Sequence, residues 1–148
     1  MALGDRTVHD LATVTQRRFP EGSQRIKVLV IDDEELMTAM VERMLRKHAD
    51  VTTAGSAEEA LTKLEDGGFD VILCDLSMPG MDGMDMHRHL CAESAASAAL
   101  ADRMIFITGG ATTDKAARFL DAMADREVSK PFDRARILAA LERFRRDR

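Results

Sequence analysis

Short apolar runs that alternate with helical patterns are the feature that most constrains how this chain can fold. Buried strands of a parallel sheet are continuous apolar runs, whereas helices repeat their apolar residues with a period near 3.6. The runs predict strands at 27–31, 50–54, 70–74, 103–108 and 126–129. With a helical segment after each strand, the pattern predicts one α/β domain built on a doubly wound, five-stranded parallel sheet flanked by five helices.

Two local signals refine this prediction. Ser56 and Glu59 have the spacing of a capping box, so the second helical segment should begin there. The alanine-rich segment 95–101 is expected to connect the third helix to the fourth strand.

Polar residues stand at the ends of the apolar runs. Asp32 and Asp33 follow one run, Asp75 and Thr108 each end another, and Lys130 stands just before Pro131. Because the carboxyl ends of parallel strands meet at one edge of the sheet, these side chains should gather in one crevice. Any one of them could be a helix cap or turn residue, but that explanation does not account for the whole set.

The gathered residues suit a divalent metal and a phosphoryl group. Three clustered carboxylates repel one another unless a hard cation with oxygen ligands shares the site, and Mg²⁺ is the natural candidate. Asp75 is then the candidate nucleophile, because an aspartate can form an acyl phosphate. Lys130 could pair with a phosphoryl oxygen, and Thr108 could donate a hydrogen bond to another.

The stretches that carry these residues resemble the receiver domains of bacterial two-component response regulators. The matching stretches are VLVIDDEE (28–35), VILCDLSMPGMDG (71–83), FITGG (106–110) and SKPF (129–132). The resemblance implies a flavodoxin-like (CheY-like) receiver fold with strand order 2-1-3-4-5. It implies a receiver domain over 26–148, preceded by an N-terminal extension or linker over 1–25.

The resemblance also implies a role for each site residue. Asp33 would be a direct Mg²⁺ ligand, and Asp32 would act largely through water. Asp75 would be both the phosphoacceptor and a metal ligand, and the backbone carbonyl of Ser77 would be the third protein ligand. Thr108 would be the switch hydroxyl and Lys130 the phosphoryl-binding lysine.

Two positions depart from the family pattern. Three residues before the lysine, the family often has an aromatic side chain that turns inward on phosphorylation, and this chain has Glu127. A carboxylate is costly to bury in an apolar slot, so the usual coupling of hydroxyl and aromatic ring should differ here. Thr108 is followed by Gly109 and Gly110, so the backbone of this loop should be able to adopt conformations that other residues disfavour. The stretch FITGG also resembles receivers attached to hybrid histidine kinases.

The resemblance implies a signalling phosphoacceptor rather than an enzyme, with only self-catalysed phosphotransfer and dephosphorylation. The phosphodonor would be a histidine kinase or a histidine phosphotransfer protein, and a downstream protein target would recognise the phosphorylated form. The first helix is a candidate docking surface for the donor because its apolar residues cover more than one narrow stripe. They are Leu36, Met37, Met40, Val41, Met44 and Leu45, and all six could instead pack inside. The sequence ends soon after the fifth predicted helix, so we expect output through contacts with a partner rather than through an attached output domain.

Two other functions are open to a chain with these residues. A degenerate receiver could bind proteins without being phosphorylated, and Glu127 is the feature that favours this alternative. A haloacid dehalogenase-type phosphohydrolase also uses an aspartate, a hydroxyl, a lysine and Mg²⁺. That family separates its first two aspartates by one residue, whereas Asp32 and Asp33 are adjacent here.

Composition limits the partners and the compartment. A net charge of −5 and a pI near 5.4 argue against direct nucleic-acid binding, which relies on a basic face. No stretch approaches the length of a membrane span, and the first residues lack the apolar core of a signal peptide. Cys74 and Cys91 show no pairing or metal-type spacing and are expected to be reduced, as in a cytoplasmic protein.

Overall fold

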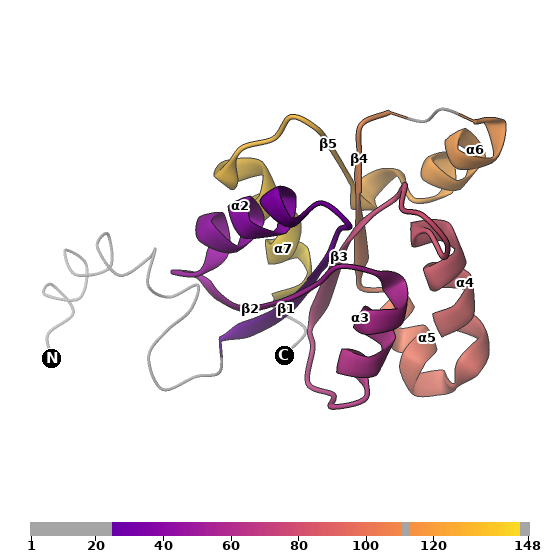
Figure 1. Ribbon diagram of the computed structural model, residues 1–148, viewed down its shortest axis with the longest axis horizontal. Coiled ribbons are helices and arrows are strands. Elements are labelled where there is room, and N and C mark those ends of the chain that lie inside the picture. The colour runs from indigo at the N-terminus through magenta and orange to yellow at the C-terminus, as the bar shows by residue number, and fades with distance from the viewer. Residues whose placement is uncertain (1–24, 111–112, 146–148) are drawn as a thin grey trace, which may run out of the picture.

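The computed structural model describes residues 25–110 and 113–145, and its centre is a five-stranded parallel sheet (Figure 1). The strands are β1 (Ile26–Ile31), β2 (Ala49–Ala54), β3 (Val71–Asp75), β4 (Met104–Thr108) and β5 (Glu127–Ser129). Their order across the sheet is β2-β1-β3-β4-β5, which confirms the predicted fold and strand order. Each strand lies within one residue of its predicted bounds at either end. The predicted extension over 1–25 lies, except for Arg25, outside the described residues.

Six α-helices surround the sheet in the described part of the chain, one more than the sequence predicted. They are α2 (Glu35–Leu45), α3 (Ala57–Leu64), α4 (Gly83–Glu93), α5 (Ala95–Ala101), α6 (Asp114–Ala122) and α7 (Arg134–Arg145). The additional helix is α5, in the segment expected to be only a connection. Alanine has the highest helix propensity, and Ser94 and Ser97 form a reciprocal capping box at its start. None of these helices is long and apolar enough to cross a membrane.

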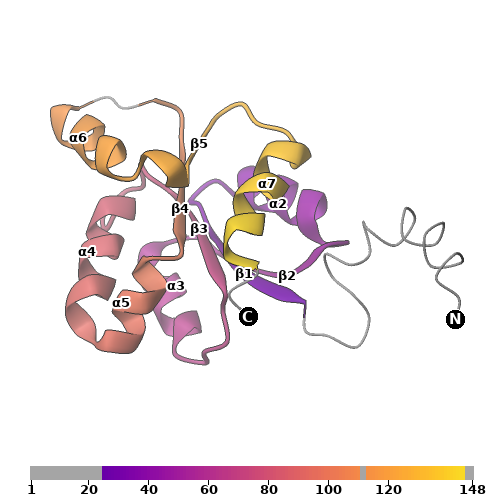
Figure 2. The ribbon, with the colours of Figure 1, turned by 180° about the vertical axis from the view of Figure 1, so that it is seen from behind.

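The helices cover the two faces of the sheet unequally (Figures 1 and 2). Helices α2 and α7 pack on one face, and α3, α4, α5 and α6 pack on the other. Side chains alternate between the faces along each strand, as the twofold repeat of a strand requires. On β4, Met104 and Phe106 belong to the α4 side of the core, while Ile105 and Ile107 belong to the α2 side.

The start of α3 follows the predicted cap in part. The Ser56 hydroxyl accepts the N–H of Glu59, as in a capping box. The Glu59 carboxylate, however, accepts the N–H of Gly55, at 2.9 Å, instead of the N–H of Ser56. The predicted helix start is therefore confirmed, but the Glu59 carboxylate accepts the N–H of the residue before the predicted partner.

A close backbone contact fixes α4 beside the end of β3. A Cβ atom at Gly83 would lie 2.9 Å from the carbonyl oxygen of Asp75 and 3.1 Å from the Cα of Leu76. The Gly83 N–H also donates to the Leu76 carbonyl at 3.1 Å, and Asp82 caps the helix with its side chain. Only glycine allows α4 to begin so close to the backbone of a predicted site residue.

We therefore expect Gly83→Ala to lower the free energy of unfolding by about 1–3 kcal/mol, because the added methyl group meets backbone atoms that cannot rotate away. Urea unfolding followed by far-UV circular dichroism measures this change. Gly109→Ala is the control, since a Cβ there meets nothing within 4 Å. The control should stay within about 0.5 kcal/mol of the wild type, and an equal loss in both variants would contradict the assignment.

Candidate functional site

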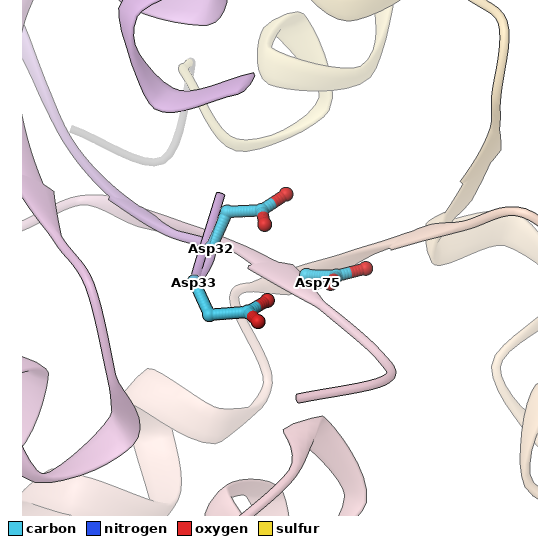
Figure 3. Close-up of side chains that lie close together, drawn as sticks. All are labelled: Asp32, Asp33 and Asp75. Atoms are coloured by element: carbon cyan, nitrogen blue, oxygen red, sulfur yellow. The ribbon is translucent and has the colours of Figure 1, made fainter. Parts of the chain in front are cut away.

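Three carboxylates meet where β1 and β3 end at the carboxyl edge of the sheet (Figure 3). Asp32 and Asp33 directly follow β1, and Asp75 is the last residue of β3. One carboxylate oxygen from each residue lies within 4.8 Å of the others. This is the gathering that the sequence predicted for these residues.

Asp32 is held in place by one bond and leaves one oxygen without a hydrogen bond. Its side chain is only 1% exposed, and its Oδ1 accepts the N–H of Glu34 at 2.9 Å. Its Oδ2 is buried and has no hydrogen-bond partner, with the Lys130 ammonium 3.9 Å away. A buried, unpaired carboxylate oxygen is costly, and a cation beside it would remove that cost. The donor set therefore fits a hard divalent ion.

Asp75 lies between the other carboxylates and a single lysine. It is 6% exposed, and its Oδ1 lies 3.6 Å from the Lys130 Nζ. Burial raises the pKa of Asp75 to about 6, with a further rise from the charge of Asp32, and both outweigh the opposing effect of Lys130. Burial also raises the pKa of Asp32. One ammonium therefore does not compensate for the carboxylates gathered here.

Lys130 reaches the site from the end of β5. The backbone N–H of Lys130 donates to the Thr108 carbonyl at 2.8 Å, which holds the chain after β5 against the end of β4. The Lys130–Pro131 peptide bond is cis. The structure thus brings Lys130 to the carboxylates, as predicted.

Thr108 is buried at the end of β4, and its hydroxyl organises the following loop. Its Oγ1 accepts the N–H of Gly110 at 2.9 Å, and Gly110 has a φ of 118°, a conformation that favours glycine. A hydroxyl can accept one hydrogen bond and still donate another. Thr108 therefore retains a proton that it could donate.

The structure places Ser77 and Glu127 without testing their predicted roles. Ser77 is exposed, two residues beyond Asp75, and its role as a carbonyl ligand stays a prediction. Glu127 begins β5 and is half-buried, and it lines a small hollow of about 170 Å³ together with Arg126, Arg136 and Arg143. Asp125 lines the same hollow, so acidic and basic residues surround it together.

The sequence reasoning missed two features near the site. The first is the close contact of Gly83 with the Asp75 carbonyl, although the position of Gly83 directly after Asp82 could have indicated a tight helix start. The second is the ring of His87, which lies edge-on to Phe106 and Phe119, with centroid distances of 5.9 and 5.5 Å. No signal in a single sequence identifies such a cluster.

Comparison with known proteins gives consistent matches. Residues 28–142 match the family model of the response regulator receiver domain. The chain is 30% identical over 122 residues to the transcriptional regulatory protein TcrA of Mycobacterium tuberculosis, covering 82% of this chain and 46% of TcrA. It is 31% identical over 127 residues to the DNA-binding response regulator MtrA of Mycolicibacterium smegmatis, covering 84% of this chain and 53% of MtrA. The chain thus spans about half the length of these relatives.

Solved structures agree with the sequence matches. The chemotaxis protein CheY4 of Vibrio cholerae superposes with a TM-score of 0.69 at 27% identity, covering 81% of this chain and 98% of CheY4. A response regulator receiver domain protein of Clostridium thermocellum gives a TM-score of 0.69 at 26% identity, covering 82% and 95% of the two chains.

The raised pKa of Asp75 predicts how stability depends on pH without metal. The folded state holds the Asp75 proton up to pH about 6, whereas an ordinary aspartate loses it near 3.8. The contribution of protonated Asp75 to the free energy of unfolding should therefore fall as the pH rises between these two values. Asp75→Asn lacks this ionisation, so at pH 7 in EDTA it should be more stable than the wild type by about 1–3 kcal/mol.

Urea unfolding at a series of pH values measures this difference. Asp66→Asn, at an exposed position after α3, is the control and should follow the wild type. Added Mg²⁺ should narrow the gap between wild type and Asp75→Asn, because the ion favours the ionised carboxylates. A gap that is the same at pH 4 and pH 7 would contradict the electrostatic explanation.

Proposed function

The chain belongs to the response regulator receiver domain family, and on that basis we propose that Asp75 accepts a phosphoryl group from a phosphohistidine in a Mg²⁺-dependent reaction. Receiver domains act in two-component signalling. The observation that supports it most is the placement of Asp75 beside two further carboxylates and Lys130.

The acidic residues would hold the metal. Asp32, Asp33 and Asp75 offer the carboxylate oxygens, and the Ser77 carbonyl would complete the protein ligands. The buried, unpaired Oδ2 of Asp32 supports this assignment. When bound, Mg²⁺ would neutralise charge so that an anionic phosphoryl group can approach an anionic aspartate.

The transfer makes one bond and breaks another. A carboxylate oxygen of Asp75 bonds to phosphorus while the bond between phosphorus and the donor's imidazole nitrogen breaks, and the nitrogen keeps the electron pair. Lys130 would then pair with an oxygen of the phosphoryl group, since its ammonium already lies 3.6 Å from Asp75 Oδ1. The domain stores the phosphoryl group as an acyl phosphate on Asp75. In a later, separate step, water hydrolyses the acyl phosphate and restores the carboxylate.

The response to phosphorylation would begin at Thr108. Its hydroxyl would donate to the phosphoryl group while its oxygen keeps the bond from Gly110, so the loop after β4 would move with it. Glu127 occupies the position of the usual aromatic residue, so we assign the coupling to the loop and to α6, whose first turn is capped by Thr113.

The phosphodonor would dock on α2. Leu36 is 87% exposed and Met40 is 39% exposed, and they lie four residues apart on one side of this helix. Because α2 begins two residues after Asp33, this apolar surface adjoins the acidic site. It suits the helical bundle of a histidine kinase or of a histidine phosphotransfer protein. The downstream partner would also be a protein, with no direct contact to nucleic acid.

Phosphorylation is tested by intact mass spectrometry after incubation of the chain with acetyl phosphate. We expect a gain of one phosphoryl group that requires Mg²⁺ and is lost in Asp75→Asn, because the acyl phosphate forms on this carboxylate. Asp66→Asn is the matched control and should be phosphorylated normally.

Two results would contradict the assignment. Phosphorylation that persists in Asp75→Asn would place the acceptor elsewhere. A folded wild type that gains no mass from acetyl phosphate or from a phosphorylated histidine phosphotransfer protein would favour a receiver that works without phosphorylation.

The docking proposal predicts a selective defect. Leu36→Lys should slow transfer from a phosphorylated histidine phosphotransfer protein by about tenfold or more, because a buried interface position would carry an unpaired charge. Phosphorylation by acetyl phosphate should not change. Thr62→Lys, exposed on α3 across the sheet, is the control. Equal rates for the two variants with the protein donor would place the docking surface elsewhere.

A further inference from the structure

A cleft separates α4 from α6 on the face of the sheet opposite α2. It has a volume of about 450 Å³, and it lies away from the three carboxylates. Seven residues line it, namely Met84, His87, Arg88, Cys91, Lys115, Arg118 and Phe119. The two helices lie on the same side of the molecule in both ribbon views (Figures 1 and 2).

Each helix offers a regular stripe to the cleft. The α4 residues Met84, His87, Arg88 and Cys91 have the spacing i, i+3, i+4, i+7, which is one face of a helix. The α6 residues have the spacing i, i+3, i+4, from Lys115 to Phe119. A cleft between two helix faces suits another helix, which would place its apolar side chains inside.

The floor of the cleft is aromatic. The rings of His87 and Phe119 meet edge-on at 5.5 Å, and each also contacts the ring of Phe106 on β4, at 5.9 and 5.0 Å respectively. Met84 adds a nearly buried thioether. These rings join the helices to the sheet and leave an apolar surface for a ligand, since aromatic and methionine side chains adapt well to apolar partners.

The rim of the cleft is cationic. Arg88 projects from α4 with its side chain 63% exposed, and Lys115 and Arg118 are exposed on α6. None of the seven lining residues, all within the described part of the chain, carries a carboxylate. Arg88 also forms an ion pair with Asp85, at 3.4 Å, outside the lining. This concentration of positive charge is notable because the whole chain has a net charge of −5.

From the apolar floor and the cationic rim, we infer that the cleft between α4 and α6 binds an acidic amphipathic helix of a partner protein. Leucine-type side chains would enter over Phe119 and Met84, and glutamate or aspartate side chains on the two flanks would meet Arg88 on one side and Lys115 and Arg118 on the other. Opposite charges on both flanks would set the orientation and speed the encounter.

Cys91 provides a direct probe of this cleft. It is exposed in the lining, whereas Cys74, the other cysteine of the chain, is buried and burial raises the pKa of its thiol. A thiol reagent should therefore modify Cys91 selectively. A helix seated in the cleft would slow this modification, independently of any change at Asp75.

The test uses the full chain and a fluorescein-labelled peptide of about 20 residues, with leucines on one face and glutamates on both flanks. Fluorescence anisotropy should show saturable binding, and alkylation of Cys91 by iodoacetamide should slow at saturating peptide. The double variant Lys115→Glu/Arg118→Glu should weaken binding by about tenfold or more, since two attractive contacts become repulsive. A peptide with lysine in place of glutamate should not bind the wild type.

The control variant is Arg43→Glu/Lys47→Glu, which makes the same charge change at exposed positions at the end of α2 and just beyond it. It should bind the acidic peptide within about twofold of the wild type. Equal weakening by both double variants would overturn the inference by showing attraction to net charge alone. The inference would also be overturned if the peptide did not bind, or if it bound without protecting Cys91. Protection of Cys91 that rises with protein concentration in the absence of peptide would overturn it too, by showing that a second copy of the chain occupies the cleft.

Discussion

Repulsion among three carboxylates at one sheet edge is the constraint around which this domain is organised. The parallel strands place Asp32, Asp33 and Asp75 together, and burial makes the ionisation of Asp32 and Asp75 more costly. Lys130 supplies one opposing charge, and its own position depends on a backbone bond to Thr108. Further positive charge would balance the arrangement, so the proposed metal binding and the proposed chemistry of Asp75 would have the same physical origin.

Much of the fold and of the site could be predicted from the sequence, because both follow from short-range patterns. Apolar runs located all five strands, and the polar residues that end them identified the carboxylates, Thr108 and Lys130. Helix α5 was missed because alanines carry no amphipathic signal. The ring cluster around His87 depends on three elements that are far apart in the chain, so no local pattern reveals it. The contact of Gly83 with the Asp75 carbonyl spans only eight residues, but its closeness depends on how α4 packs beside the end of β3.

The two proposed docking surfaces lie on opposite faces of the sheet. The exposed apolar residues of α2 adjoin the acidic site and suit a phosphodonor. The cleft between α4 and α6 lies on the other side, where an arriving donor would not cover it. A receiver arranged in this way could hold its donor and an acidic partner at the same time. The loop after Thr108 leads directly to α6, so the state of the site could affect the cleft without passing through Glu127.

The tight start of α4 has a mechanical consequence. Gly83 seats this helix against the carbonyl of the residue that would be modified, so α4 is a fixed reference within the domain. Helix α6 instead contacts α4 and the sheet through side chains, since the Phe119 ring meets the rings of His87 and Phe106. The separation of the two helices is therefore a natural coordinate for the signalling state, and paired spin labels on α4 and α6 would record it as a distance.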